Sequence, residues 1–173
     1  RQNGRDQEAS SADQKMIPEK NQKYFSEKIA YLPNFQINDS KQLIPSTIFT
    51  KKDLGLPMQG FIFCCFNNTY KITPSIFDSW GRILKKVEGS VLLVYADNKS
   101  AQINLKKEIV QRNIDPNRLI FGKHLPKEEY LARYHIADLF LDTHPYNAGT
   151  TASDALRMGL PVLTLEGSSF NSR

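Results

Sequence analysis

The chain has 173 residues, 40% of them hydrophobic, and a formal net charge of +5. This length suits one domain with a substantial core, and no stretch approaches the ~20 consecutive apolar residues of a membrane-spanning helix. The lysines form pairs scattered over separate segments, which disfavours a nucleic-acid-binding face. We expect a soluble domain that binds neither a membrane nor nucleic acid.

The N-terminal third divides into two stretches. Residues 1–22 are mostly polar, which predicts a disordered lead-in or linker. Residues 23–58 contain apolar patches, with a strand expected near Ile29 to Leu32, and are predicted to connect the domain to upstream sequence. Because the chain starts without Met and stops soon after an expected core strand, we expect a piece of a larger protein.

From residue 59 onward, strand-like and helix-like runs alternate. The first helix is expected to begin at Pro74 with Thr73 as its N-cap, followed by apolar residues on one face. The expected strands are 61–66, 91–96, 119–121, 139–142 and 161–165, and the later helices are 100–112, 126–137 and 151–158. This alternation predicts an α/β, Rossmann-like, doubly wound parallel sheet, whose ligands bind beyond the carboxyl ends of the strands.

Two cysteines lie next to each other in the first expected strand of this sheet. Cys64 and Cys65 would point to opposite faces, so a disulfide between them would be strained. We therefore expect free, buried thiols, which favour a reducing compartment and a cytoplasmic location.

The loop before the helix at 151–158 offers an anion site. Gly149, Thr150 and Thr151 would present backbone N–H groups and hydroxyls at a helix N-terminus, which suits a diphosphate. Alternatively, Thr151 only caps the helix and Asp154 closes a capping box with it. The residue types leave both interpretations open.

Other polar residues are ambiguous by themselves. Lys71, five residues past the first strand of the sheet, could neutralise a leaving phosphate or be a solvated loop lysine. Asn67 and Asn68 fit a turn or a ligand contact, and Lys127 and Arg133 fit surface charges. The histidines have no metal-ligand spacing, and neither a Gly-x-Gly-x-x-Gly nor a Walker motif is present, which disfavours a metal site, a dinucleotide oxidoreductase and a P-loop enzyme.

Four stretches, in order, resemble the C-terminal catalytic domain of the O-GlcNAc transferase family and its bacterial and SPINDLY-like relatives. They are 61–74 (Phe-Ile-Phe-Cys-Cys-Phe-Asn-Asn-Thr-Tyr-Lys-Ile-Thr-Pro), 125–129, 137–143 running on to 150–156, and 159–164. The lead-in 24–33 is also similar, so the resemblance covers about residues 23–173. It implies that residues 59–173 form the donor-binding, C-terminal half of a GT-B glycosyltransferase.

The resemblance also implies an activity. The full-length protein would transfer GlcNAc from UDP-GlcNAc to Ser or Thr of proteins, without a metal or cofactor. The general base and tetratricopeptide-type repeats for the protein acceptor would lie upstream, so the fragment alone would be inactive.

The resemblance places particular residues around the donor. Lys71 would stabilise the leaving diphosphate, and Asp154 would take a ribose hydroxyl. The positions implied near the phosphates and the sugar are Asn68, Lys71, Tyr146, Gly149, Thr150 and Thr151. The positions implied near the nucleoside are Leu125, Lys127, Arg133 and Asp154.

Two positions depart from the family pattern. Gly149 stands where many relatives carry a histidine that lies against the nucleotide, and Asn68 stands where they carry glutamine. Three alternatives follow for the function. They are a protein fucosyltransferase with a GDP-fucose donor, a non-catalytic nucleotide-sugar-binding or partner-binding module, and a GT-B-shaped sugar-nucleotide epimerase.

Overall fold

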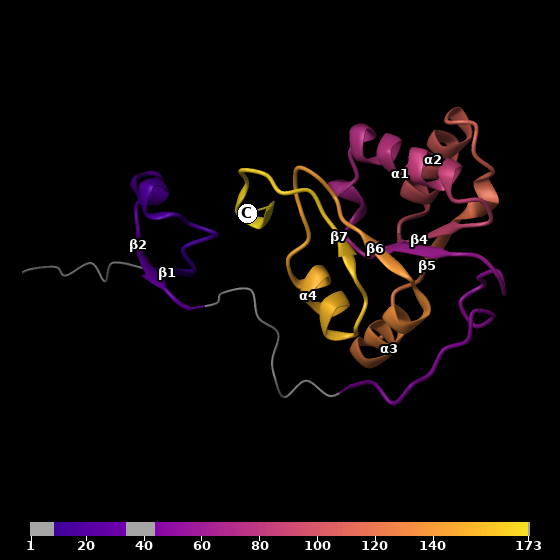
Figure 1. The fold of residues 1–173 in the computed structure, drawn as a ribbon, viewed down its shortest axis with the longest axis horizontal. Coiled ribbons are helices and arrows are strands. Elements are labelled where there is room, and N and C mark those ends of the chain that lie inside the picture. Colours follow the sequence, from indigo (N-terminus) through magenta and orange to yellow (C-terminus); the bar gives the residue numbers. More distant parts are fainter. Residues whose placement is uncertain (1–8, 34–43, 173) are drawn as a thin grey trace, which may run out of the picture.

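A computed structural model describes residues 9–33 and 44–172. Its main feature is a five-stranded parallel sheet in the order β5-β4-β3-β6-β7. The strands are β3 (Ile62–Cys65), β4 (Val91–Tyr95), β5 (Leu119–Gly122), β6 (Leu139–Leu141) and β7 (Val162–Leu163). Helices α1 (Pro74–Lys86) and α2 (Lys99–Gln111) lie on one face, and α3 (Lys127–Ala132) and α4 (Thr150–Arg157) on the other (Figure 1). The predicted doubly wound α/β fold is confirmed.

The strand order places a topological switch between β3 and β6. The chain builds β3, β4 and β5 outward in one direction and then returns to add β6 and β7 on the other side of β3. In open parallel sheets, the crevice outside the carboxyl ends of the strands at this switch is the usual ligand site. The fold therefore directs attention to the residues that follow β3 and β6.

The first helix forms as its sequence predicts. Thr73 Oγ1 accepts a hydrogen bond from Ile76 N at 3.4 Å, and Pro74 occupies the first turn. One face buries Phe77 and Trp80 against the sheet, while the opposite face is exposed. A capped amphipathic helix of this kind covers a sheet face by burying apolar area, at about 25 cal/mol per Å².

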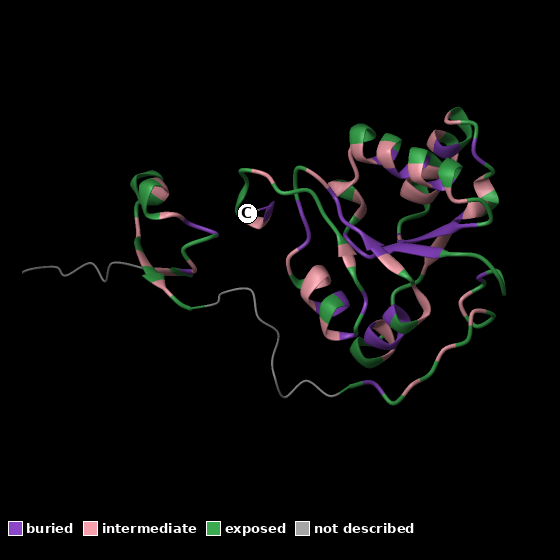
Figure 2. Cartoon of the chain, viewed as in Figure 1, coloured by how far each residue is buried: buried purple, intermediate pink, exposed green. Residues whose placement is uncertain are grey.

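The sheet itself forms the core. All four residues of β3 are buried, and Figure 2 shows burial concentrated on the central strands. Cys64 and Cys65 are free and fully buried, as predicted. Burial raises the pKa of Cys65 to about 12, so this thiol is protonated and inert at neutral pH.

Part of residues 1–22, expected to be a disordered or linker lead-in, forms regular secondary structure. Strand β1 (Ala9–Ala12) pairs in parallel with β2 (Lys28–Tyr31), and Ser10 Oγ donates to Glu27 Oε1 at 2.8 Å. A 3₁₀ helix at Glu19–Tyr24 follows β1. The backbone ladder with β2 gives the polar segment its structure, whereas residues 1–8 lie outside the described part.

Some predicted elements differ in extent. The helix expected over 126–137 is α-helical only through Ala132 and continues as a 3₁₀ helix at Arg133–Ile136. The strand expected over 161–165 is limited to Val162–Leu163. Across residues 9–33 and 44–172, every helix is too short or too polar to cross a bilayer.

Candidate functional site

A cavity of about 360 Å³ opens beyond the carboxyl ends of β3, β4 and β5. Its size lies within the ~300–1,000 Å³ range of small-molecule sites. Its walls are Phe66, Tyr95, His124, Leu125, Pro126, Lys127, Tyr130, Arg133 and Thr151. The structure thus brings together four of the predicted site residues, namely Leu125, Lys127, Arg133 and Thr151.

Arg133 forms the inner wall of this cavity. Its side chain is only 1% exposed, and its guanidinium carbon lies 3.9 Å from the centroid of the Phe66 ring. Nη1 donates to the carbonyl of Lys123 at 3.0 Å, while Nε is buried without a hydrogen-bond partner. Burial lowers the pKa of Arg133, an effect that the nearby Tyr130 phenol opposes. The interpretation of Arg133 as a surface charge is wrong, and its edge can donate to a planar, acceptor-rich ligand.

Gly122 makes the position of Arg133 possible. A Cβ at residue 122 would lie 2.9 Å from Nη1 of Arg133, closer than side-chain atoms normally approach. Gly122 is the last residue of β5, and Arg133 is the first residue of the 3₁₀ helix that follows α3. The missing side chain therefore allows the guanidinium to lie against the sheet edge.

Lys127 and Asp154 form an ion pair next to the cavity. Lys127 Nζ lies 2.9 Å from Asp154 Oδ2, and the side chains are 55% and 2% exposed, respectively. Helix α4 begins at Thr150 with Gly149 as its N-cap, so Thr151 lies inside the helix and is not the cap of a capping box. A buried carboxylate beside an exposed lysine suits recognition of ligand hydroxyls.

A second cationic group lies around Lys71, at the end of the 3₁₀ helix Thr69–Lys71. Lys71 Nζ donates to the carbonyl of Asn147 at 3.3 Å and lies 4.0 Å from the centroid of the Tyr146 ring. Both partners are neutral, so the ammonium charge is available to an anion. Asn68 caps the 3₁₀ helix by accepting from Tyr70 N at 3.4 Å, which supports its turn role.

Helix α4 offers a further place for an anion. No side chain hydrogen bonds to its first turn from the N-cap position, which is Gly149. The backbone N–H groups of Thr150 and Thr151 stand in that first turn, at the positive end of the helix dipole. Thr150 is exposed and Thr151 also lines the cavity, so an anion here would lie beside it.

A buried polar network, of which the predicted site contains only Thr151, connects the two cationic groups. Asn67, two residues after the end of the buried strand β3, donates from Nδ2 to Asp142 Oδ1 at 3.1 Å and accepts from Thr151 Oγ1. Asp142, directly after β6, also accepts from Asn147 Nδ2 at 3.1 Å. The signal that could have identified Asp142 is a polar residue at the carboxyl end of an apolar strand at the switch point.

Together, the site offers cations, an uncapped helix N-terminus, a buried carboxylate and an aromatic-walled cavity. These groups complement a ligand with a planar ring, hydroxyls and an anionic portion. Within the described residues, no three His, Cys, Asp or Glu side chains are grouped so as to hold a metal ion.

The chain is similar to known glycosyltransferases. Residues 45–173 match glycosyl transferase family 41. The Arabidopsis thaliana protein named "Probable UDP-N-acetylglucosamine--peptide N-acetylglucosaminyltransferase SEC" is 35% identical over 147 residues, which cover 82% of this chain and 15% of that protein. The Caenorhabditis elegans UDP-N-acetylglucosamine--peptide N-acetylglucosaminyltransferase is 36% identical over 75% of this chain and 12% of its own length.

A solved structure supports the same relationship. The Thermobaculum terrenum O-GlcNAc transferase mutant K341M matches with a TM-score of 0.78 and 27% sequence identity, over 96% of this chain and 31% of its own. The chain therefore spans a small part of these relatives. The fold and the match over residues 45–173 show that the chain belongs to glycosyl transferase family 41.

Proposed function

We propose that this chain is the donor-binding portion of a glycosyltransferase that moves GlcNAc from UDP-GlcNAc to Ser or Thr hydroxyls of proteins. The observation that carries the proposal is one continuous site, from the cavity beside Arg133 to the ammonium of Lys71, with Asn67 and Thr151 between them. The names of the plant and nematode relatives specify this donor and a peptide acceptor.

The nucleoside fits the cavity side of the site. Arg133 offers its guanidinium edge to carbonyl acceptors of the base, and Leu125 supplies apolar contact at the mouth. Asp154 remains charged and accepts hydrogen bonds from the ribose hydroxyls. Lys127, which is exposed, moves toward solvent when the ribose takes its place. Burial raises the pKa of Tyr130, so its phenol remains a neutral hydrogen-bonding group there.

The diphosphate fits the Lys71 side. Negative charge on the departing diphosphate grows as the glycosidic bond breaks, so groups that stabilise this charge lower the barrier. Lys71 contributes its ammonium, and the first-turn N–H groups of Thr150 and Thr151 add the positive end of the α4 dipole. In this proposal no metal is needed. Tyr146, half exposed and in contact with Lys71, lies on the sugar side, and Asn68 and Gly149 border the phosphates.

The remaining functions belong to the larger protein. The general base and the repeats that bind the acceptor protein lie upstream in this proposal. The protonated, buried thiols of Cys64 and Cys65 are compatible with a cytoplasmic location.

The test is a donor panel on the full-length protein. Calorimetric titration with UDP-GlcNAc, UDP, GDP-fucose and GDP should give binding of the uridine nucleotides in the presence of a chelator. Labelled GlcNAc should then appear on a Ser- or Thr-containing protein acceptor. Absence of uridine-nucleotide binding would refute the proposal, and exclusive binding of guanosine nucleotides would reassign the donor.

A further inference from the structure

The carboxylate of Asp142 lies at the switch point of the sheet and is not among the expected donor contacts. The residue directly follows β6 and is only 6% exposed. Its two oxygens accept five hydrogen bonds, all from neutral groups. The donors are Asn67 Nδ2 (3.1 Å), Thr143 N (2.7 Å) and Ala148 N (2.8 Å) to Oδ1, and Asn147 Nδ2 (3.1 Å) and Thr164 Oγ1 (2.7 Å) to Oδ2.

Two of these bonds close the loop that precedes α4. Thr143 N and Ala148 N both donate to Oδ1, so one oxygen holds the two ends of segment 143–148. Within that segment, the carbonyl of Asn147 accepts from Lys71 Nζ and the Tyr146 ring lies under the same ammonium. The next residue is the N-cap of α4. Asp142 therefore fixes the partners of Lys71 and the start of α4 at once.

Asp142 also sets the direction of the hydrogen bonds toward α4. An ionised carboxylate only accepts, so Asn67 must present Nδ2 to it and turn Oδ1 toward Thr151. The Thr151 hydroxyl must then donate its proton to Asn67. The hydroxyl hydrogen of Thr151 is therefore used inside the protein, and the backbone N–H groups of the first turn remain for a ligand.

We propose that Asp142 is a positioning residue for the diphosphate of the nucleotide donor. This inference rests on the proposed function. Asp142 contacts no ligand itself, and it acts by holding loop 143–148, the start of α4 and the Lys71 partners in one geometry. Asp142→Asn keeps the size of the side chain but replaces one acceptor oxygen with an NH₂ group, which would face N–H or O–H donors of the network.

The test compares a ligand with phosphates and one without them, on the full-length protein. For Asp142→Asn, the affinity for UDP measured by calorimetry should fall about tenfold or more, because the anion-binding groups lose their alignment. The affinity for uridine should stay within about threefold, because Arg133 and Leu125 on the cavity side do not contact the network. The kcat with UDP-GlcNAc should fall together with the UDP affinity.

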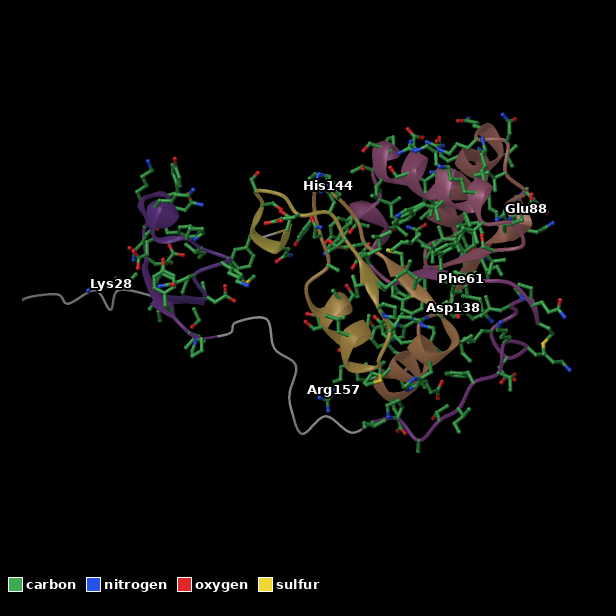
Figure 3. The ribbon with its side chains drawn as sticks, in the orientation of Figure 1. Lys28, Phe61, Glu88, Asp138, His144 and Arg157 are labelled. Carbon is green, nitrogen blue, oxygen red and sulfur yellow. The ribbon has the colours of Figure 1, made fainter. Side chains whose placement is uncertain are left out.

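Asp138→Asn is the matched control, because it makes the same change at the opposite end of the same strand. Asp138 Oδ2 accepts from Ile62 N at 2.7 Å, at the amino ends of β6 and β3. Figure 3 shows Asp138 beside Phe61 and away from His144, which belongs to the loop after β6. Affinities of Asp138→Asn for both ligands should remain within about twofold of wild type.

Several results would overturn the inference. Unchanged UDP affinity in folded Asp142→Asn would do so, as would equal losses for UDP and uridine, which indicate general loss of structure. If Asp142→Asn does not fold, Thr164→Val can replace it, because this change removes one donor to the same carboxylate. The UDP affinity of Thr164→Val should be lower than that of Thr164→Ser, which keeps the hydroxyl. Equal UDP affinities of these two variants would refute the role. Absence of UDP binding by wild type would instead overturn the proposed function, and this inference with it.

Discussion

Asp154→Asn separates ligand binding from folding at the buried end of the Lys127 ion pair. The side chain of Asp154 is 2% exposed, whereas that of Lys127 is 55% exposed and can be solvated once the pair is broken. Asn keeps the size of the side chain, so the folding cost should be about 1.5–3 kcal/mol, the range for losing a hydrogen bond to a charged group. The variant should therefore fold, with a melting temperature moderately below that of wild type.

The expected loss in donor binding is of similar size. A hydrogen bond from a ribose hydroxyl to a charged, buried carboxylate contributes about 1.5–3 kcal/mol, which corresponds to a roughly 10- to 150-fold loss of affinity. Asp154→Ala should lose at least as much affinity and also more stability, because it removes side-chain packing in a buried position. Calorimetry with UDP and thermal denaturation of the full-length protein measure the two quantities separately.

Glu128→Gln is the matched control for this substitution. Glu128 lies on α3 near Lys127, and its carboxylate accepts from Ser46 outside the cavity, at 2.9 Å from the hydroxyl. The same loss of one negative charge should leave UDP affinity within about twofold. Wild-type affinity in folded Asp154→Asn would refute the ribose role and return Asp154 to a purely structural one.

Three further predictions follow from the described contacts. Lys71→Ala in the full-length enzyme should lower kcat more than it raises KM for the donor, because its charge acts mainly in the transition state, and a kcat within twofold of wild type would contradict this role. Gly122→Ala should weaken uridine binding several-fold, because the new Cβ would lie 2.9 Å from Nη1 of Arg133 and displace it. Unchanged binding would show that the guanidinium does not contact the base. The free energy of unfolding should be insensitive to Cys65 below about pH 9 and should fall between pH 9 and 12. The reason is that the thiol ionises near its usual pKa of 9.0 in the unfolded chain, whereas burial raises its pKa to about 12 in the folded protein. Denaturant titrations of wild type and Cys65→Ala across this range check the last prediction, and parallel curves would contradict it.

The sheet and its covering helices are predictable because local signals agree with the tertiary structure. Phe61 to Phe66 is a continuous apolar run, as expected for a strand buried on both faces, and Thr73 with Pro74 marks a helix start. The strand at Ala9–Ala12 gives no such signal, because it is short and its small residues do not alternate between apolar and polar in the way that marks a half-buried strand. Its structure depends on pairing with Lys28–Tyr31, which is information that lies in another segment.

Arg133 shows where residue type misleads. A charged residue on an expected helix usually lies at the surface, but Arg133 is buried against the ring of Phe66. The residue stands where the α-helix ends and a 3₁₀ helix begins. Resemblance to the family placed Arg133 at the nucleoside, whereas its charge alone suggested solvent.

The connection between the two halves of the site depends on geometry that no linear pattern contains. Asn67 and Asp142 follow strands that are neighbours only because the chain returns across β3 after β5. The carboxylate then dictates which atom Asn67 presents to Thr151, and the same carboxylate anchors the loop that faces Lys71. Since a shift of Asp142 moves loop 143–148 together with the start of α4, the groups that face the phosphates are aligned at the switch point of the sheet, whereas Arg133 on the nucleoside side is held by Lys123 and Phe66.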